Sequence, residues 1–124
     1  MTLAEHISSA SYAERKKVGC VIVKDNNIIS FGYNGTPHGF DNICEENNIT
    51  KKEVIHAESN AITKCAKSTL SSLDSDMYVT LMPCVECAKL IIQSGIKNVY
   101  YRESYRDLSG IELLKKSNIN VFNI

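Results

Sequence analysis

The sequence predicts an α/β protein, in which a mixed sheet of about five strands lies between helices in a three-layer α/β/α sandwich. Three observations favour this class. The chain has 124 residues, which suits one domain spanning residues 1–124. Short apolar runs alternate with segments of helical periodicity, and no repeat or low-complexity tract interrupts them. A tight turn joins the first two strand-like runs, whereas helices separate the later ones, so both antiparallel and parallel pairs are expected.

The first half of the chain predicts a helix, a hairpin, a long loop and a second helix. Apolar residues at helical spacing predict the first helix over residues 2–14. Val18–Val23 and Ile28–Tyr33 flank an Asp-Asn-Asn turn, which predicts a β-hairpin. Residues 35–52 contain proline and glycine and predict a loop of a length that is more often functional than passive. A helix is then expected over residues 56–68.

The second half alternates between strands and helices. Apolar, β-branched and aromatic runs predict strands at residues 76–82, 97–102 and 119–124. Helices are expected at residues 84–95, where a glycine ends the segment, and at residues 108–117. Because a helix separates each of these strands from the next, they should run parallel to one another.

Composition limits the classes of function. Fourteen basic residues balance fourteen acidic ones, which argues against a broad basic face that binds nucleic acid. No apolar run approaches the roughly 18–20 residues of a membrane span, and the N-terminal segment has no export signal, so no membrane partner is expected. The five cysteines are an odd number, which favours a reducing cytoplasm over a disulfide scaffold.

Three residues have the types and spacing of a zinc site. Cys84 and Cys87 have Cys-x-x-Cys spacing and stand at the expected start of a helix, where backbone dipoles stabilise thiolates. His56 stands at the expected start of another helix, and helix N-termini converge at the carboxyl ends of strands in open α/β sheets. Three protein ligands leave a position for water, which is the pattern of a catalytic zinc. Such a site needs a proton carrier, for which Glu58 is the candidate.

The position of Glu58 sets a geometric condition. Residues i and i+2 do not share a face inside a helix. His56 must therefore occupy the first turn or the cap of its helix if both side chains are to face one metal ion.

Other interpretations fit the same residues. Cys84 and Cys87 could be a redox pair, since Cys-x-x-Cys near a βα unit is also typical of that chemistry. Cys44 could be a fourth ligand, which would close the site into a structural one. His56 could be a core histidine with satisfied hydrogen bonds. The remaining residues of these types are expected at the surface (His6 and His38) and in the core (Cys20 and Cys65).

Two segments match a known signature in full. "HAE" at residues 56–58 and "PCVEC" at residues 83–87 have the pattern His-x-Glu…Pro-Cys-x-x-Cys of zinc-dependent nucleobase deaminases. Nearly the whole chain further resembles the deoxycytidylate (dCMP) deaminase family. The most telling part is the loop Gly-Tyr-Asn-Gly-Thr-Pro at residues 32–37.

The resemblance implies a cytidine deaminase-like fold and the hydrolytic deamination of dCMP to dUMP and ammonia, which supplies dUMP for thymidylate synthesis. It implies that His56, Cys84 and Cys87 bind one Zn²⁺ per subunit, and that Glu58 is not a ligand but carries protons. Some members of the family build a second, structural zinc site from a cysteine near the end of the first helix or from a histidine pair. This chain has neither feature.

The resemblance also implies substrate-binding residues. Asn34 would hold the sugar, and Tyr105 would contact the 5′-phosphate, for which Lys17 is a further candidate. The substrate-binding candidates together are Asn34, Thr36, Ala57, Thr80, Tyr105, Arg15 and Arg106.

Regulation and assembly follow from the same resemblance. Many members are hexamers that dCTP activates and dTTP inhibits, and Gly32, Tyr33, Asn34 and Gly35 form the candidate regulatory loop. A homo-oligomer, and Mg²⁺ accompanying a dCTP effector, are implied in the same way.

Two other functions fit parts of the same pattern. The first is another zinc deaminase, acting on cytidine or on tRNA adenosine. The neutral charge balance weakens the tRNA alternative, and a nucleoside substrate would leave the loop and Tyr105 without a nucleotide to hold. The second is a zinc-binding module without activity, which would leave Glu58 without a role and the fourth ligand missing.

Overall fold

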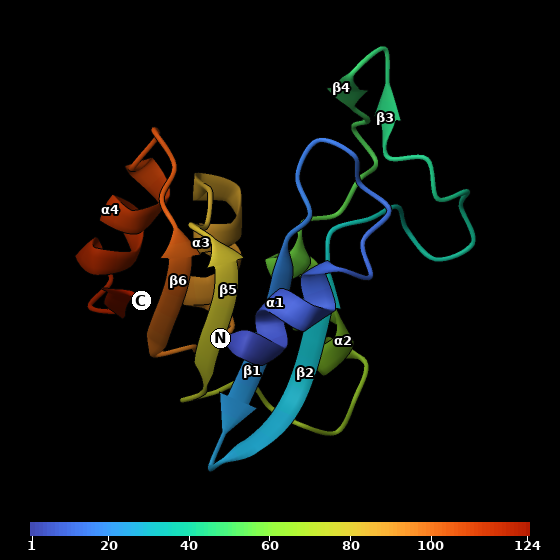
Figure 1. Cartoon of the computed structure of the whole chain (residues 1–124). Coiled ribbons are helices and arrows are strands. Elements are labelled where there is room, and N and C mark those ends of the chain that lie inside the picture. The colour runs from blue at the N-terminus through green and yellow to red at the C-terminus, as the bar shows by residue number, and fades with distance from the viewer.

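The computed structural model describes residues 1–124 and contains four helices around a five-stranded sheet. In chain order the elements are α1 (Thr2–Ser8), β1 (Gly19–Lys24), β2 (Asn27–Tyr33), β3 (Glu45–Glu46), β4 (Ile49–Thr50), α2 (Ala57–Ala66), β5 (Asp76–Leu81), α3 (Val85–Gln93), β6 (Asn98–Glu103), α4 (Ser109–Lys116) and β7 (Asn120–Asn123). The strand order is β2-β1-β5-β6-β7, and β3 with β4 forms a separate ribbon that projects from the body (Figure 1).

The sheet is mixed, as predicted. β1 pairs antiparallel with β2 and with β5, whereas β5, β6 and β7 are parallel. Asp25 and Asn26 turn the hairpin with φ values of 51° and 64°, a left-handed conformation that Asp and Asn adopt more readily than most residues. The predicted α/β/α class with about five strands is therefore confirmed.

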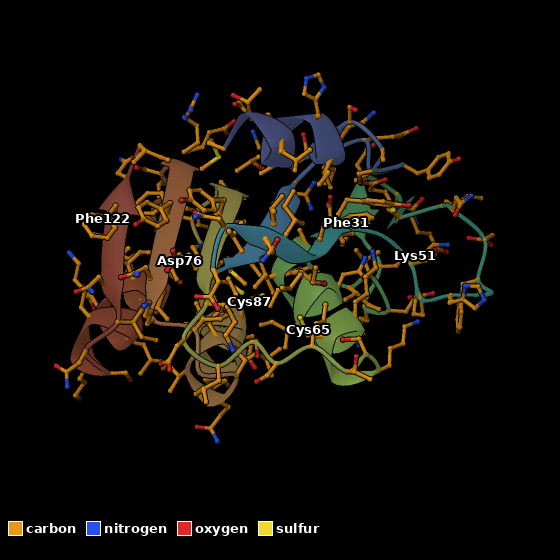
Figure 2. All side chains as sticks on the ribbon, turned by 90° about the horizontal axis from the view of Figure 1, so that it is seen from below. Phe31, Lys51, Cys65, Asp76, Cys87 and Phe122 are labelled. Atoms are coloured by element: carbon orange, nitrogen blue, oxygen red, sulfur yellow. The ribbon has the colours of Figure 1, made fainter.

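Helices cover the two faces of the sheet unequally. α1 lies on one face, over β1, and α2, α3 and α4 lie on the other (Figure 2). The main core forms between the sheet and these three helices, where Ile22, Met77 and Leu114 are fully buried. Cys20 and Cys65 belong to this core, and His6 and His38 are exposed, as expected.

The first helix is shorter than predicted, because it ends at Ser8 rather than at residue 14. The hydroxyls of Ser8 and Ser9 donate to helix carbonyl groups, and side chains of this type compete with continued helix formation. Beyond them, Ser11 is buried and its hydroxyl donates to the carbonyl oxygen of Asn34 at 2.7 Å. A long-range contact therefore holds the segment out of the helix.

The loop predicted over residues 35–52 contains the β3–β4 ribbon. Asn47 and Asn48 turn this ribbon with φ values of 55° and 62°. Strands of two residues are too short to show an alternating pattern, so the sequence alone did not reveal them.

The candidate site residues lie along one edge of the sheet. β5 and β6 end at this edge, β1 begins there and β2 ends there, since β1 is antiparallel to both of its neighbours. The chain then enters α3 directly after β5. No helix in the structure combines the length and the apolar character that crossing a membrane requires.

Candidate metal centre and active site

His56 is the N-cap of α2, with an extended backbone (φ −70°, ψ 156°), so the condition set by Glu58 is met. The residue before it is held by a two-way backbone pairing. Gly35 N–H donates to the carbonyl of Ile55 at 3.1 Å, and Ile55 N–H donates to the carbonyl of Gly35 at 2.7 Å. The loop at residues 32–37 therefore fixes the entry into the helix that carries His56.

The two cysteines lie at the start of α3. Cys84 is its N-cap, with an extended backbone, and its Sγ accepts the backbone N–H of Cys87 at 3.5 Å. Cys87 lies in the first turn, is buried, and points into the space between α2 and α3 (Figure 2). Pro83 is fully buried just before this turn and cannot donate a backbone hydrogen bond, which suits the change from strand to helix.

The three side chains converge. Nδ1 of His56 lies 3.3 Å from Sγ of Cys87 and 3.5 Å from Sγ of Cys84. All three ligand atoms lie within 4.8 Å of one another. Tetrahedral zinc with bonds of about 2.0–2.1 Å to nitrogen and 2.3 Å to sulfur would separate such atoms by roughly 3.5 Å, so this donor set fits the ion.

Electrostatics within the cluster favour a bound cation. A hydrogen bond with Cys87, and then one with His56, lower the pKa of the Cys84 thiol to about 3. The pKa of Cys87 is raised, first by the same bond with Cys84, and the pKa of His56 is raised by its hydrogen bond to Cys84. The three groups share protons that a metal ion would replace.

Glu58 is buried beside this cluster, with 4 % of its surface exposed. Burial is the main cause that raises the pKa of its carboxyl to about 7. No Lys or Arg forms an ion pair with it. A buried carboxyl without a counter-charge exchanges a proton readily, which is the property that a general acid–base group requires.

Thr80 and Asn34 lie at the same edge of the sheet, where both hold the backbone. Oγ1 of the buried Thr80 accepts the N–H of Gly19 at 3.1 Å. Oδ1 of Asn34 accepts the N–H of Val18 at 2.8 Å, and its Nδ2 donates to the carbonyl of Lys16 at 2.8 Å. Each side chain keeps some hydrogen-bonding capacity, since the amide has a second N–H and the hydroxyl has its own proton.

Two of the other candidates are held in place by the structure, and four are exposed. Ala57 is buried as the first residue of α2, and Thr36 donates to the carbonyl of Asp41 at 2.5 Å. The candidates for contacting the phosphate are exposed and form no ion pair: Arg15, Lys17, Tyr105 and Arg106. They stand in the segments before β1 and after β6, at the edge that carries the metal cluster.

Cys44 is not part of the metal cluster. It is buried near the carbonyl of Asn42, in the long loop, so a closed site with Cys44 as the fourth ligand does not form.

Sequence reasoning missed Ser59, whose hydroxyl lies 3.6 Å from Sγ of Cys87. Its position three residues after His56 was a usable signal, because residues i and i+3 share a helix face.

A cavity of about 540 Å³ opens beside the loop at residues 32–37. Its lining includes Tyr33, Gly35, Asn60, Lys64 and Lys67. Nζ of Lys64 stands 4.2 Å from the ring centroid of Phe31, which is within the range of a cation–π contact.

Comparison with known proteins places the chain in a family. Residues 1–103 match the model of the cytidine and deoxycytidylate deaminase zinc-binding region. A probable deoxycytidylate deaminase of Caenorhabditis elegans is 42% identical over 88% of the chain, and the deoxycytidylate deaminase of Enterobacteria phage T4 is 33% identical over all of it. The chain spans 58% of the length of the worm protein and 87% of the phage protein.

Solved structures agree with this result. The dCMP deaminase of the cyanophage S-TIM5, in complex with dCMP and dUMP, matches with a TM-score of 0.96 at 42% identity. The match covers 99% of this chain and 92% of that one. The predicted cytidine deaminase-like fold is therefore confirmed over almost the whole chain. The chain therefore belongs to the cytidine and deoxycytidylate deaminase zinc-binding family.

Proposed function

We propose that the protein is a zinc-dependent hydrolase that converts dCMP and water into dUMP and ammonia, and that the dUMP supplies thymidylate synthesis. The observation that carries the proposal is the buried carboxyl of Glu58 beside the cluster of His56, Cys84 and Cys87. The similar cyanophage enzyme, whose structure contains dCMP and dUMP, supports this choice of substrate.

Zinc held by His56, Cys84 and Cys87 would supply Lewis-acid chemistry that makes water a nucleophile near neutral pH. In the reaction the water oxygen bonds to C4 of the cytosine ring, and the bond between C4 and the amino nitrogen breaks. Glu58 passes the first proton of the water to ring N3 and the second to the departing amino group. The products then balance as a uracil ring with a C4 carbonyl and an N3–H, and ammonia.

The substrate would lie along the edge of the sheet that carries the cluster. We assign the base to the region of Ala57 and Thr80, and the sugar to Asn34, with Thr36 completing the loop. The 5′-phosphate is assigned to Tyr105, Arg15 and Arg106. Their exposure and lack of ion pairs support this assignment, because such donors are free to meet an anion.

Regulation is proposed for the loop of Gly32, Tyr33, Asn34 and Gly35. The adjoining cavity, which Lys64 and Lys67 help to line, offers room and charge for a nucleoside triphosphate. We propose that dCTP with Mg²⁺ activates the enzyme, that dTTP inhibits it, and that the active form is a homohexamer. The five free cysteines support a reducing, cytoplasmic setting.

The test is ammonia release by the zinc-loaded protein with dCMP, deoxycytidine, CMP or dCTP, each with and without dCTP and Mg²⁺ as activators. Glu58→Gln keeps the shape of the side chain but removes its proton transfer. We expect dCMP turnover in the unchanged protein and a fall of at least about 10²-fold in the variant, with zinc content retained. Glu112→Gln, an exposed carboxyl in α4, is the control and should behave as the unchanged protein.

Each contrary result has a definite meaning. Equal turnover of deoxycytidine would reject the assignment of a phosphate site. Turnover that survives in Glu58→Gln would reject the proton-carrying role. Zinc-loaded protein that releases no ammonia from any of the four substrates, with activator present, would reject the proposed reaction.

A further inference from the structure

Ser59 lies in the first turn of α2, three residues after the N-cap His56 and on the same side of the helix. Its Oγ lies 3.6 Å from Sγ of Cys87, and this sulfur is its hydrogen-bond partner in the structure. The contact is partly buried and joins α2 to α3 across the metal cluster. Either atom can donate when Cys87 carries its proton. Once Cys87 is a thiolate, only the serine hydroxyl has a proton to give.

Both ligand sulfurs contact His56, and beyond it each has a different hydrogen-bond partner. Sγ of Cys84 accepts a backbone N–H from the first turn of its own helix, at 3.5 Å. Sγ of Cys87 lies 3.6 Å from the hydroxyl oxygen of Ser59, on the neighbouring helix, and this hydroxyl is the donor once Cys87 is a thiolate. The backbone N–H that bonds to Cys84 is present in any α-helical Cys-x-x-Cys turn. The hydroxyl beside Cys87 is present only because residue 59 is a serine.

We propose that Ser59 is a positioning residue of the metal centre: its hydroxyl donates to the Cys87 thiolate, orients the sulfur and withdraws electron density from it. Such a partner fixes the orientation of a ligand atom, and loss of the partner typically lowers metal affinity. A sulfur with less electron density also donates less to the metal, which leaves the metal a stronger Lewis acid. The inference deepens the proposed zinc-dependent function and rests on it.

The test replaces zinc with Co²⁺, whose thiolate charge-transfer absorption reports on the ligand sulfurs. Three variants are compared with the unchanged protein: Ser59→Ala, Ser59→Thr and Thr63→Ala. Thr63 is the matched control, because its hydroxyl lies on the same helix but donates to backbone carbonyls at 2.9 and 3.1 Å. Metal affinity is measured in parallel by competition with a chelator.

We expect Ser59→Ala to move the charge-transfer band to longer wavelength, because a more electron-rich sulfur gives up an electron more easily. Its metal affinity should fall roughly tenfold, at the lower end of the range for lost partners of metal ligands. Ser59→Thr keeps a hydroxyl and should restore both properties, and Thr63→Ala should leave both unchanged.

Two results would overturn this inference while leaving the proposed function intact. One is a Ser59→Ala band and affinity equal to those of the unchanged protein. The other is the same shift in Thr63→Ala, which would point to a general effect on the helix. If the unchanged protein binds Co²⁺ without any thiolate band, the metal site and the inference fall together.

Discussion

The hydroxyl of Thr80 and the side-chain amide of Asn34 accept the backbone N–H groups of Gly19 and Val18, the two residues through which the chain enters β1. Both side chains therefore hold the start of β1, at the edge of the sheet that carries the metal cluster. Thr80 and Asn34 are also candidates for contacting the substrate. Substitution of either residue is expected to lower stability, so any effect on substrate binding must be measured separately.

Thr80→Val tests the structural role of the Thr80 hydroxyl. Valine has nearly the same shape but leaves the buried N–H of Gly19 without an acceptor, which costs about 1–3 kcal/mol of the free energy of unfolding. Denaturant unfolding followed by circular dichroism measures the loss. Thr69→Val, at an exposed position, is the control and should change stability by less than about 0.5 kcal/mol. Equal midpoints for the two variants would contradict the assigned role.

At the scale of elements, α4 positions the metal ligands although it contributes none. Its second residue, Gly110, is buried against the turn that precedes α3. A Cβ atom at this position would lie 2.2 Å from the carbonyl oxygen of Pro83 and 2.8 Å from the carbonyl carbon of Cys84. The backbone of α4 therefore supports the backbone of the ligand turn directly, and no larger side chain fits between them.

The effect of Gly110→Ala on stability tests the contact between α4 and the ligand turn. In an open helix this change stabilises by about 1 kcal/mol through helix propensity. Here we expect a loss of about 1–3 kcal/mol, because the methyl group must displace the ligand turn. Metal affinity should fall with it, as measured by chelator competition. Glu112→Ala, at an exposed site on the same helix, should retain full metal affinity, and retained affinity in Gly110→Ala would refute the positioning role.

At the scale of the whole molecule, the metal cluster joins two parts of the sheet. α2, which His56 caps, packs on β1 and β2, while the cysteines begin α3, which follows β5 and packs on α4. His56 and Cys84 are 28 residues apart in the sequence. A metal ion bound between them would therefore clamp the hairpin half of the domain to the parallel half.

Metal removal should accordingly lower the unfolding temperature. A ligand that binds only the folded state, at a free concentration a thousand times its Kd, stabilises by about 4 kcal/mol. For a domain of this size that loss corresponds to roughly 10 °C or more in Tm. Calorimetry of the zinc-loaded protein before and after chelation measures the change. The double variant Cys84→Ser/Cys87→Ser should show no response to chelator, and a Tm that chelation leaves unchanged in the unsubstituted protein would contradict the clamp.

Most of the helices and strands, and the metal cluster, could be predicted from the sequence. Local periodicity and turn residues encode which segments are strands and helices, and the hairpin and the three later parallel strands agree with the structure. The metal cluster could be predicted because two short motifs, each at the start of a helix, contain typical zinc ligands: His56, Cys84 and Cys87.

Features that depend on contacts between residues distant in sequence could not be predicted from local patterns. The first helix stops at Ser8, and Ser11 beyond it is bonded to the loop at Asn34 instead of continuing the helix. Two further contacts also join separate elements. Gly110 of α4 supports the turn that carries Cys84, and the Ser59 hydroxyl of α2 contacts Sγ of Cys87 in α3. Helical and strand periods describe neighbours within an element, whereas these contacts arise only when packing has brought different elements together.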